Sequence, residues 1–157
     1  MTEGYLDAIK DALVTHISES DSSLSPATTH VLPNLNEDVW KYDTTNLPIV
    51  TVRIGPSVDM ENFQGRQLGG NKMGIHVKIF FTAVLFHNVN ETENEDKNKT
   101  AMQLAELIKE NLLRSDDSTS GICYYSDVTI RESLSGMANV SKMIIEGYVF
   151  ARRPFNI

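Results

Sequence analysis

The chain has 157 residues and a formal net charge of -7 at pH 7, from 14 basic and 21 acidic residues. At this length one core buries roughly 68 to 70% of the unfolded chain's surface, so we expect a single domain. The hydrophobic share of 41% and the charged share of 22% exclude a disordered chain. The negative charge disfavours diffuse binding to nucleic acid or anionic membrane, because such binding neutralises phosphate with cations.

Signals for membrane insertion and secretion are missing from the sequence. No apolar run approaches the ~18 residues that cross a bilayer, and the first residues lack the basic and then apolar order of a secretory signal. The one cysteine, Cys123, cannot form an internal disulfide, which is typical of a reducing compartment. We therefore expect a soluble, unprocessed chain.

The first predicted element is a helix from about Glu3 to Ser18, with Thr2 as its N-cap. Its apolar residues are spaced three, four and four apart and form one stripe, which consists of Leu6, Ile9, Leu13 and Ile17. A loop rich in Ser and Asp follows and ends at Pro26. The pattern from Thr28 to Leu47 is irregular, and we assign no element there.

A strand is predicted from Leu47 to Ile54, in the segment LPIVTVRI. Val50, Val52 and Ile54 point to one face and polar residues to the other, as in a half-buried strand. Pro48 falls at the start of the strand, where a missing hydrogen-bond donor is tolerated.

A longer strand is predicted from Gly74 to His87. Its outer face changes along the strand from polar to apolar, through His76 and Lys78 and then Phe80, Val84 and Phe86. The second half is therefore apolar on both faces, and we expect a helix or another subunit to cover it.

The segment between these strands, Gly55 to Met73, is predicted to be a loop. It is rich in glycine, has few regularly spaced apolar residues, and at ~19 residues is too long for a simple hairpin turn. Loops of this size are usually binding loops or disordered segments.

The second half of the chain predicts a helix and two strands. Thr92 and Glu95 have capping-box spacing, and the helix should run to about Leu113. Strands are predicted from Ile122 to Glu132 and from about Lys142 to Arg152. The order helix, two strands, helix, two strands predicts an α+β fold, with a mostly antiparallel sheet of about four strands and two main helices packed on one face.

Motifs that carry chemistry are missing. The four histidines show no metal-binding spacing, and Cys123 lacks a nucleophile motif. Gly69 and Gly70 belong to no phosphate-binding pattern. We therefore expect no enzyme activity, no catalytic or metal-binding residue and no cofactor.

The elements in this order resemble the tail terminator, or tail completion, proteins of tailed bacteriophages. The likeness covers nearly the whole chain and rests on element order and hydrophobic pattern rather than on an invariant signature. The segments that carry it are the helix from Glu3 to Ser18, LPIVTVRI, GIHVKIFFTAVLF, AMQLAELIKENLL and MIIEGYVFARR.

The resemblance implies a structural virion protein of the tail or neck, assembled in the host cytoplasm. Such a protein forms a ring, typically a hexamer, that caps the tail tube, ends its polymerisation and joins the tail to the head-side connector. Its partners are further copies of itself, the tail tube protein, a connector or neck protein and, in a contractile tail, the sheath protein. DNA passes through without specific binding, and an acidic lumen would favour this by repelling phosphate.

A ring needs two different contact sides on each copy. One candidate side is the outer strand face of Phe80, Val84 and Phe86, and the other is the C-terminal region of Tyr148, Phe150, Arg152, Arg153 and Phe155. The alternative for the strand face is that the helices cover it as ordinary core. The candidate segment for docking on the tube is the long loop, through Phe63, Arg66, Lys72 and Met73, and the alternative there is a plain mobile loop.

Other functions stay open from the sequence. Within the same class, the chain could be a head-closure or head-tail joining protein. From other classes, it could be a monomeric ligand-binding or enzymatic α+β domain, or an RNA-binding sheet. The RNA-binding alternative rests on four strand aromatics near Arg152 and Arg153, namely Tyr124, Tyr125, Tyr148 and Phe150.

Overall fold

The computed structural model describes residues 5–24, 31–33, 47–59, 74–88, 99–114, 122–134, 136 and 140–154. The helical elements in this part of the chain are α1 (Tyr5–Ser18), the short 3-10 helix η1 (Ser22–Leu24) and α4 (Ala101–Arg114). The strands are β1 (Val31–Pro33), β2 (Ile49–Asp59), β3 (Gly74–Asn88), β4 (Ile122–Ser133) and β5 (Val140–Pro154). Neither helix is long and apolar enough to cross a membrane within these described ranges.

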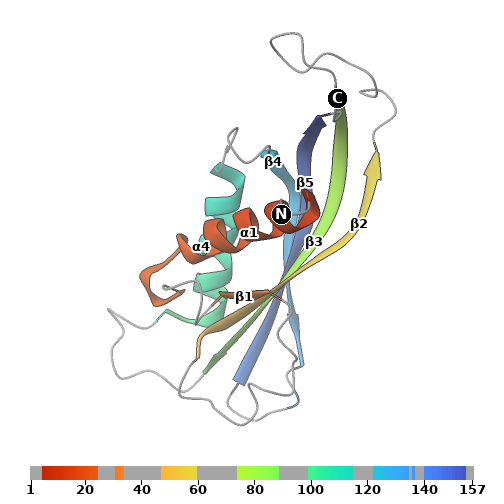
Figure 1. Cartoon of the computed structure of the whole chain (residues 1–157). Coiled ribbons are helices and arrows are strands. Elements are labelled where there is room, and N and C mark those ends of the chain that lie inside the picture. The colour runs from red at the N-terminus through yellow and green to blue at the C-terminus, as the bar shows by residue number, and fades with distance from the viewer. Residues whose placement is uncertain are drawn as a thin grey trace.

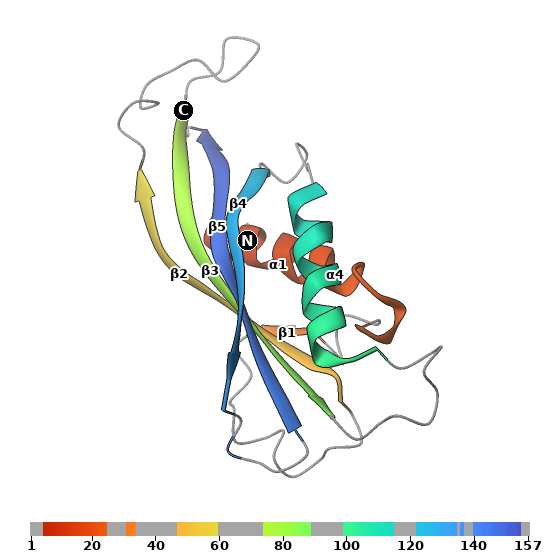
Figure 2. The same ribbon diagram turned by 180° about the vertical axis from the view of Figure 1, so that it is seen from behind.

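The five strands form one sheet in the order β1-β2-β3-β5-β4. All neighbouring pairs are antiparallel except β1 and β2, which run parallel. Both helices lie on the same side of this long, twisted sheet (Figures 1 and 2). The predicted α+β class, with a mostly antiparallel sheet and two helices packed on one face, is confirmed.

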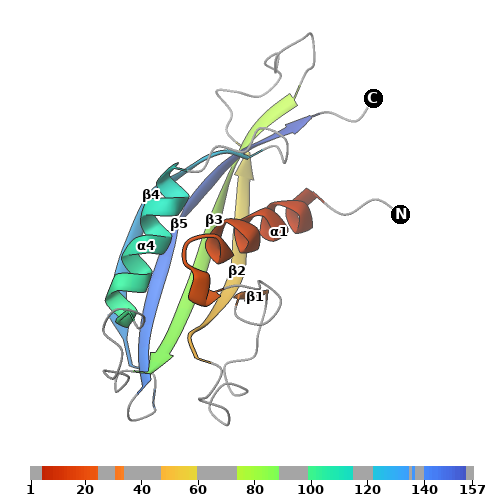
Figure 3. The ribbon, with the colours of Figure 1, turned by 90° about the vertical axis from the view of Figure 1, so that its left-hand side faces the viewer.

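The two helices divide one face of the sheet between them. In Figure 3, α4 runs along the strands over β4 and β5, whereas α1 crosses the strands near β2. Both bury an apolar stripe of helical spacing, which is Ile9, Leu13 and Ile17 on α1 and Leu104, Ile108 and Leu112 on α4. Opposite them β3 contributes alternate residues to the same core, from Ile79 and Phe81 to Leu85. Leu6, predicted as part of the α1 stripe, is instead 43% exposed.

The start of α4 differs from the prediction. The helix begins at Ala101, and its capping box consists of Thr100 and Gln103. The backbone N–H of Thr100 donates to Oε1 of Gln103 over 2.9 Å, and the backbone N–H of Gln103 donates to Oγ1 of Thr100 over 3.2 Å. The predicted box of Thr92 and Glu95 lies outside the described residues, and the box that caps α4 is the later one. The same spacing occurs twice in this region, so the motif alone did not place the boundary.

The strand β2 is longer than predicted and continues through Gly55 to Asp59. The first residues of the predicted Gly55 to Met73 loop therefore belong to the sheet. Its register against β3 shifts between Ile54 and Ser57, which is where Gly55 and Pro56 occur. A bulge tolerates a proline in a strand, so residues that indicated a loop instead mark an irregularity. The short strand β1 lies in the region to which no element was assigned.

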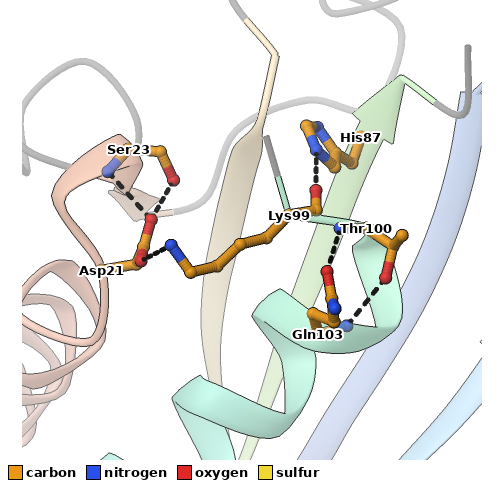
Figure 4. A network of polar contacts seen from close by, with 6 residues as sticks. All are labelled: Asp21, Ser23, His87, Lys99, Thr100 and Gln103. Carbon is orange, nitrogen blue, oxygen red and sulfur yellow. Dashed lines mark hydrogen bonds and ion pairs between the residues drawn. The ribbon is translucent and has the colours of Figure 1, made fainter. Parts of the chain in front are cut away.

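A polar network fixes the start of α4 against its neighbours (Figure 4). Nζ of Lys99 lies 2.9 Å from Oδ1 of Asp21, next to η1. The other oxygen, Oδ2, accepts hydrogen bonds from the backbone N–H and the hydroxyl of Ser23. Nε2 of the buried His87, on β3, donates to the carbonyl oxygen of Lys99 over 2.7 Å. Lys99 and Thr100, the two residues before the helix, thus link η1, β3 and α4.

A second bulge joins the two strands at the other side of the sheet. The pairing of β4 with β5 shifts between Ser126 and Thr129, and Asp127 has a positive φ of 55°. Here the backbone of β4 lies against Gly147 of β5. A Cβ at Gly147 would be 3.0 Å from both the carbonyl oxygen of Ser126 and Cα of Val128. These are backbone atoms, so the close approach requires glycine.

We predict that Gly147→Ala lowers the free energy of unfolding by about 1 to 3 kcal/mol, because backbone must move to admit the methyl group. Urea denaturation measures the loss. Gly55→Ala is the control, since its Cβ would meet mainly the ring of Phe80 at 3.0 Å, and a side chain shifts more readily than backbone. Equal losses in the two variants would contradict this account of the bulge.

We also predict that the Asp21 network contributes stability that acid removes. Burial raises the pKa of Asp21, but hydrogen bonds from Ser23 and the ion pair with Lys99 outweigh burial and hold the pKa below its ordinary value of 3.8. A carboxyl whose pKa is lower in the folded than in the unfolded chain stabilises the fold at pH values above its unfolded-state pKa. This contribution disappears as the pH falls through its folded-state pKa.

The variant Asp21→Asn should therefore lose about 1 kcal/mol near pH 7, and the gap to the wild type should close below pH 3.8. Urea denaturation from about pH 6 to about pH 3 measures the gap. Asp11→Asn, exposed on α1, is the matched control and should differ little from the wild type. A gap for Asp21→Asn that persists unchanged in acid would rule out the ion pair as its cause.

Candidate functional site

The sheet face opposite the helices holds the predicted strand residues. Side chains directly opposite each other on neighbouring antiparallel strands point to the same face. On this open face Val84 is paired with Ile144, Thr82 with Glu146, and Phe80 with Tyr148. The face therefore has an apolar end, a polar middle and an aromatic end.

At the apolar end, Val84 and Phe86 are already buried within one copy of the chain, with 8% and 0% of their surface exposed. They belong to a second buried cluster, separate from the main core, with Leu47, Ile49, Val140 and Ile144, and with Leu32 packed against it. The helices contribute nothing to this cluster, because they cover the other face. Of the predicted contact face, Val84 and Phe86 thus need no partner subunit to exclude water.

The polar middle of the open face is a row of charged and hydroxyl side chains. Arg53 of β2 is paired with Thr82 of β3, and Glu146 of β5 with Thr129 of β4. Nε of Arg131 lies 3.2 Å from Oε1 of Glu146 in an ion pair at the surface. Arg53 is exposed. This row separates the buried cluster from the aromatic end.

The aromatic end consists of Lys78, Phe80, Tyr148 and Phe150, and we refer to these four residues as the aromatic patch. The rings of Phe80 and Tyr148 meet edge to face, with centroids 5.6 Å apart. Nζ of Lys78 lies 4.1 Å from the centroid of Tyr148 and 5.8 Å from that of Phe150. All four side chains are half-buried. The patch is thus an ordered cation–π cluster that remains partly open to solvent.

Glycine helps to form the patch. Gly55 of β2 lies beside Phe80, and a Cβ there would come within 3.0 Å of Cδ1 of the Phe80 ring. The ring therefore packs over bare backbone at the bulge of β2, in space that any other residue would occupy.

The structure brings together only part of the predicted contact residues. Phe80, Tyr148 and Phe150 share the patch, although they were assigned to two different sides of the subunit. Arg152 and Arg153 lie on β5 opposite His76 and Ile75 of β3, and only their backbone is described. Outside the described residues lie Phe155 and the four predicted docking residues Phe63, Arg66, Lys72 and Met73.

Lys78 is the patch member that sequence reasoning missed. It was noted only as a polar residue on the outer face of its strand. The signal that could have found it is its position two residues before Phe80, but its contact with Tyr148 depends on the register of β3 against β5. Hydrophobic alternation decides which face of each strand is buried, but it does not distinguish registers that differ by two residues.

The aromatics proposed for RNA binding are divided between the two faces. Tyr148 and Phe150 are on the open face, whereas Tyr125 is buried on the helix side. There its hydroxyl lies 2.7 Å from Nδ1 of His16, and its ring meets Phe81 edge to face. Among the described residues, no group of three His, Cys, Asp or Glu side chains could hold a metal ion.

A groove lies on the opposite side of the molecule, beside the exposed surface of α4. It has a volume of about 260 Å³ and is lined by Lys99, Gln103, Glu106, Leu107 and Glu110. Glu106 and Glu110 are exposed, while the charge of Lys99 is paired with Asp21. Met102 and Leu113 of the same helix are 41% and 51% exposed. The outer surface of α4 thus combines carboxylates with uncovered apolar side chains.

Comparisons with known proteins add no family to this picture. No protein-family model matches the chain, and a search of curated proteins found no significant match.

We predict that Lys78 and Tyr148 stabilise the fold jointly. Urea denaturation of Lys78→Met, Tyr148→Leu and the double variant should give a coupling of about 0.5 to 1 kcal/mol, because the ammonium lies over the ring. The control cycle pairs Lys78→Met with Phe150→Leu. Its coupling should be smaller, since Nζ is 5.8 Å from that ring. Additive effects in the Lys78 and Tyr148 cycle would show that the contact carries no free energy.

Proposed function

We propose that this chain is a tail terminator of a tailed bacteriophage, which assembles into a ring, caps the tail tube and joins the tail to the head-side connector. The observation that carries the proposal is the element order. The elements α1, β2, β3, α4, β4 and β5 follow the order on which the resemblance rests, with the short β1 added. The packing of both helices on one face of a mostly antiparallel sheet is compatible with that order.

The surface of the subunit supports an assembly role. A capping ring works through contacts between copies and with the tube, so it needs partly open surfaces on different sides of each subunit. The aromatic patch on the sheet and the exposed apolar residues of α4 are two such surfaces, and they lie on opposite faces. A different neck protein would use the same kind of surface, so tube capping is the property to test.

The net charge supports the passage of DNA through such a ring. With 21 acidic and 14 basic residues in each copy, an assembled ring is strongly negative and repels phosphate. DNA would then slide through the lumen without binding.

RNA binding is a second candidate, and one observation favours it. The aromatic patch places Tyr148 and Phe150 beside Lys78 on an open sheet face, which is the arrangement that stacks bases. Against it, Lys78 lies over the Tyr148 ring, and Tyr125 is buried on the other side of the sheet. Fluorescence anisotropy with labelled single-stranded RNA separates the two functions, because RNA binding should weaken steeply with added salt.

We predict that the chain stops the growth of tail tubes. Preformed tubes of the tail tube protein from the same virus are incubated with the chain, and labelled tube protein is then added. Electron microscopy should show rings at tube ends and no labelled extension, because a capped end offers no site for the next tube subunit.

Tubes treated with the heat-denatured chain provide the control and should continue to grow. Continued growth of labelled tube in the presence of the folded chain would refute the capping role. Rings on the connector but never on the tube would favour a different neck component.

A further inference from the structure

We infer that the aromatic patch of one copy binds the groove beside α4 of the next copy. This inference rests on the proposed function, because it names the two surfaces that would close the ring. The occupant of the groove is therefore a second copy of this chain, through Lys78 and Arg53 and the rings beside them.

The open sheet face provides the cationic side of the contact. Arg53 is exposed, and Lys78 is held at a defined place by the ring of Tyr148 at 4.1 Å. The neighbouring carboxylate, Glu146, is paired with Arg131 at 3.2 Å, so it does not cancel these two charges. Beside the cations, Phe80 and Phe150 offer partly exposed aromatic surface.

The α4 surface provides the acidic side. Glu106 and Glu110 are exposed at the groove, and Lys99, the cation at the same groove, is bound to Asp21 at 2.9 Å. Met102 and Leu113 leave apolar surface on the same helix, next to the carboxylates. At 100° per residue, Lys109 lies across the stripe of Met102 and Leu113 from the groove, and the exposed Arg114 lies on the groove side, one turn beyond Glu110. Glu106, two turns before Arg114, is therefore the carboxylate that the groove presents beside the apolar stripe.

The two surfaces complement each other in charge and in hydrophobicity. Cations beside aromatic rings meet carboxylates beside Met and Leu, and both sets of apolar groups lose water on contact. The chain as a whole is negative, so association depends on this local separation of charge. A groove of about 260 Å³ has room for one long side chain of the next copy.

The placement of the two surfaces permits a ring. They lie on opposite faces of one subunit, since the patch is on the open sheet face and α4 covers the other face (Figure 2). Contacts between two different surfaces are heterologous, and copies joined in this way form a closed ring when the rotation between neighbours completes a circle. A pair of identical patches would instead stop at a dimer.

Charge reversal with mixing tests the contact. In Lys78→Glu the new carboxylate faces Glu106 of the next copy, and in Glu106→Lys the new ammonium faces Lys78. Native mass spectrometry and analytical ultracentrifugation of each variant alone should show self-association weakened at least about ten-fold.

An equimolar mixture of the two variants should restore association. Every contact in an alternating ring then joins opposite charges, so the mixture should yield oligomers with equal numbers of both variants and an even total. Oligomers larger than a dimer distinguish this arrangement from an isologous contact, which would stop at a dimer of the two variants.

Reversals elsewhere on the surface provide matched controls. Lys10→Glu and Asp11→Lys change the same charges on α1, away from both surfaces, and should associate like the wild type. Circular dichroism and urea denaturation identify any variant that fails to fold. Arg53→Glu replaces Lys78→Glu in the mixture if the loss of the cation–π contact destabilises that variant.

The inference is overturned if the wild type stays monomeric at high concentration, if single reversals leave association unchanged, or if the mixture fails to restore it. These outcomes are separate from the capping experiment. A chain that stops tube growth while its reversals have no effect caps the tube through other surfaces, and a chain that forms the ring but permits growth has a different function.

Discussion

The fold depends on one strand that must exclude water from both of its faces. β3 lies at the centre of the sheet between β2 and β5, and its sequence from Ile79 to Phe86 is apolar at every position but Thr82. One face packs Phe81, Ala83 and Leu85 against both helices, and the other packs Val84 and Phe86 into a second cluster. The layer of two helices on one side and the small cluster on the other follow from this double burial.

Most of the fold could be predicted from periodicity. Both helices and the strands β2, β3 and β5 have apolar spacings of 3.6 or 2 residues, whereas β4 alternates poorly across its bulge. The packing of the helices on one side of a mostly antiparallel sheet follows from alternating burial. The boundaries of elements were mispredicted where the same residues or spacing are compatible with two different structures. Gly55 and Pro56 usually end a strand but here mark a bulge, and the capping-box spacing occurs twice before α4. β1 has only three residues, too few for a period to appear.

The surface could be predicted less well than the core. Phe80 was correctly placed on the outer face of its strand, but only the register of β3 against β5 brings it to Tyr148 and adds Lys78. Alternation likewise does not say how far a buried cluster extends along a face, so Val84 and Phe86 could not be distinguished from Phe80 in advance. Contacts between distant strands depend on register, which the order of residues along one strand does not contain.

The bulge at Asp127 affects whether the edge of the sheet can pair with a strand of another chain. Among the described strands β4 pairs with β5 alone, so it is an edge of the sheet, and its unpaired backbone groups could recruit a strand from another chain. The positive φ of Asp127 and the register shift beside it interrupt the regular ladder at that edge, and they place an exposed carboxylate there. The bulge and the carboxylate thereby protect this edge of the sheet against aggregation by strand addition.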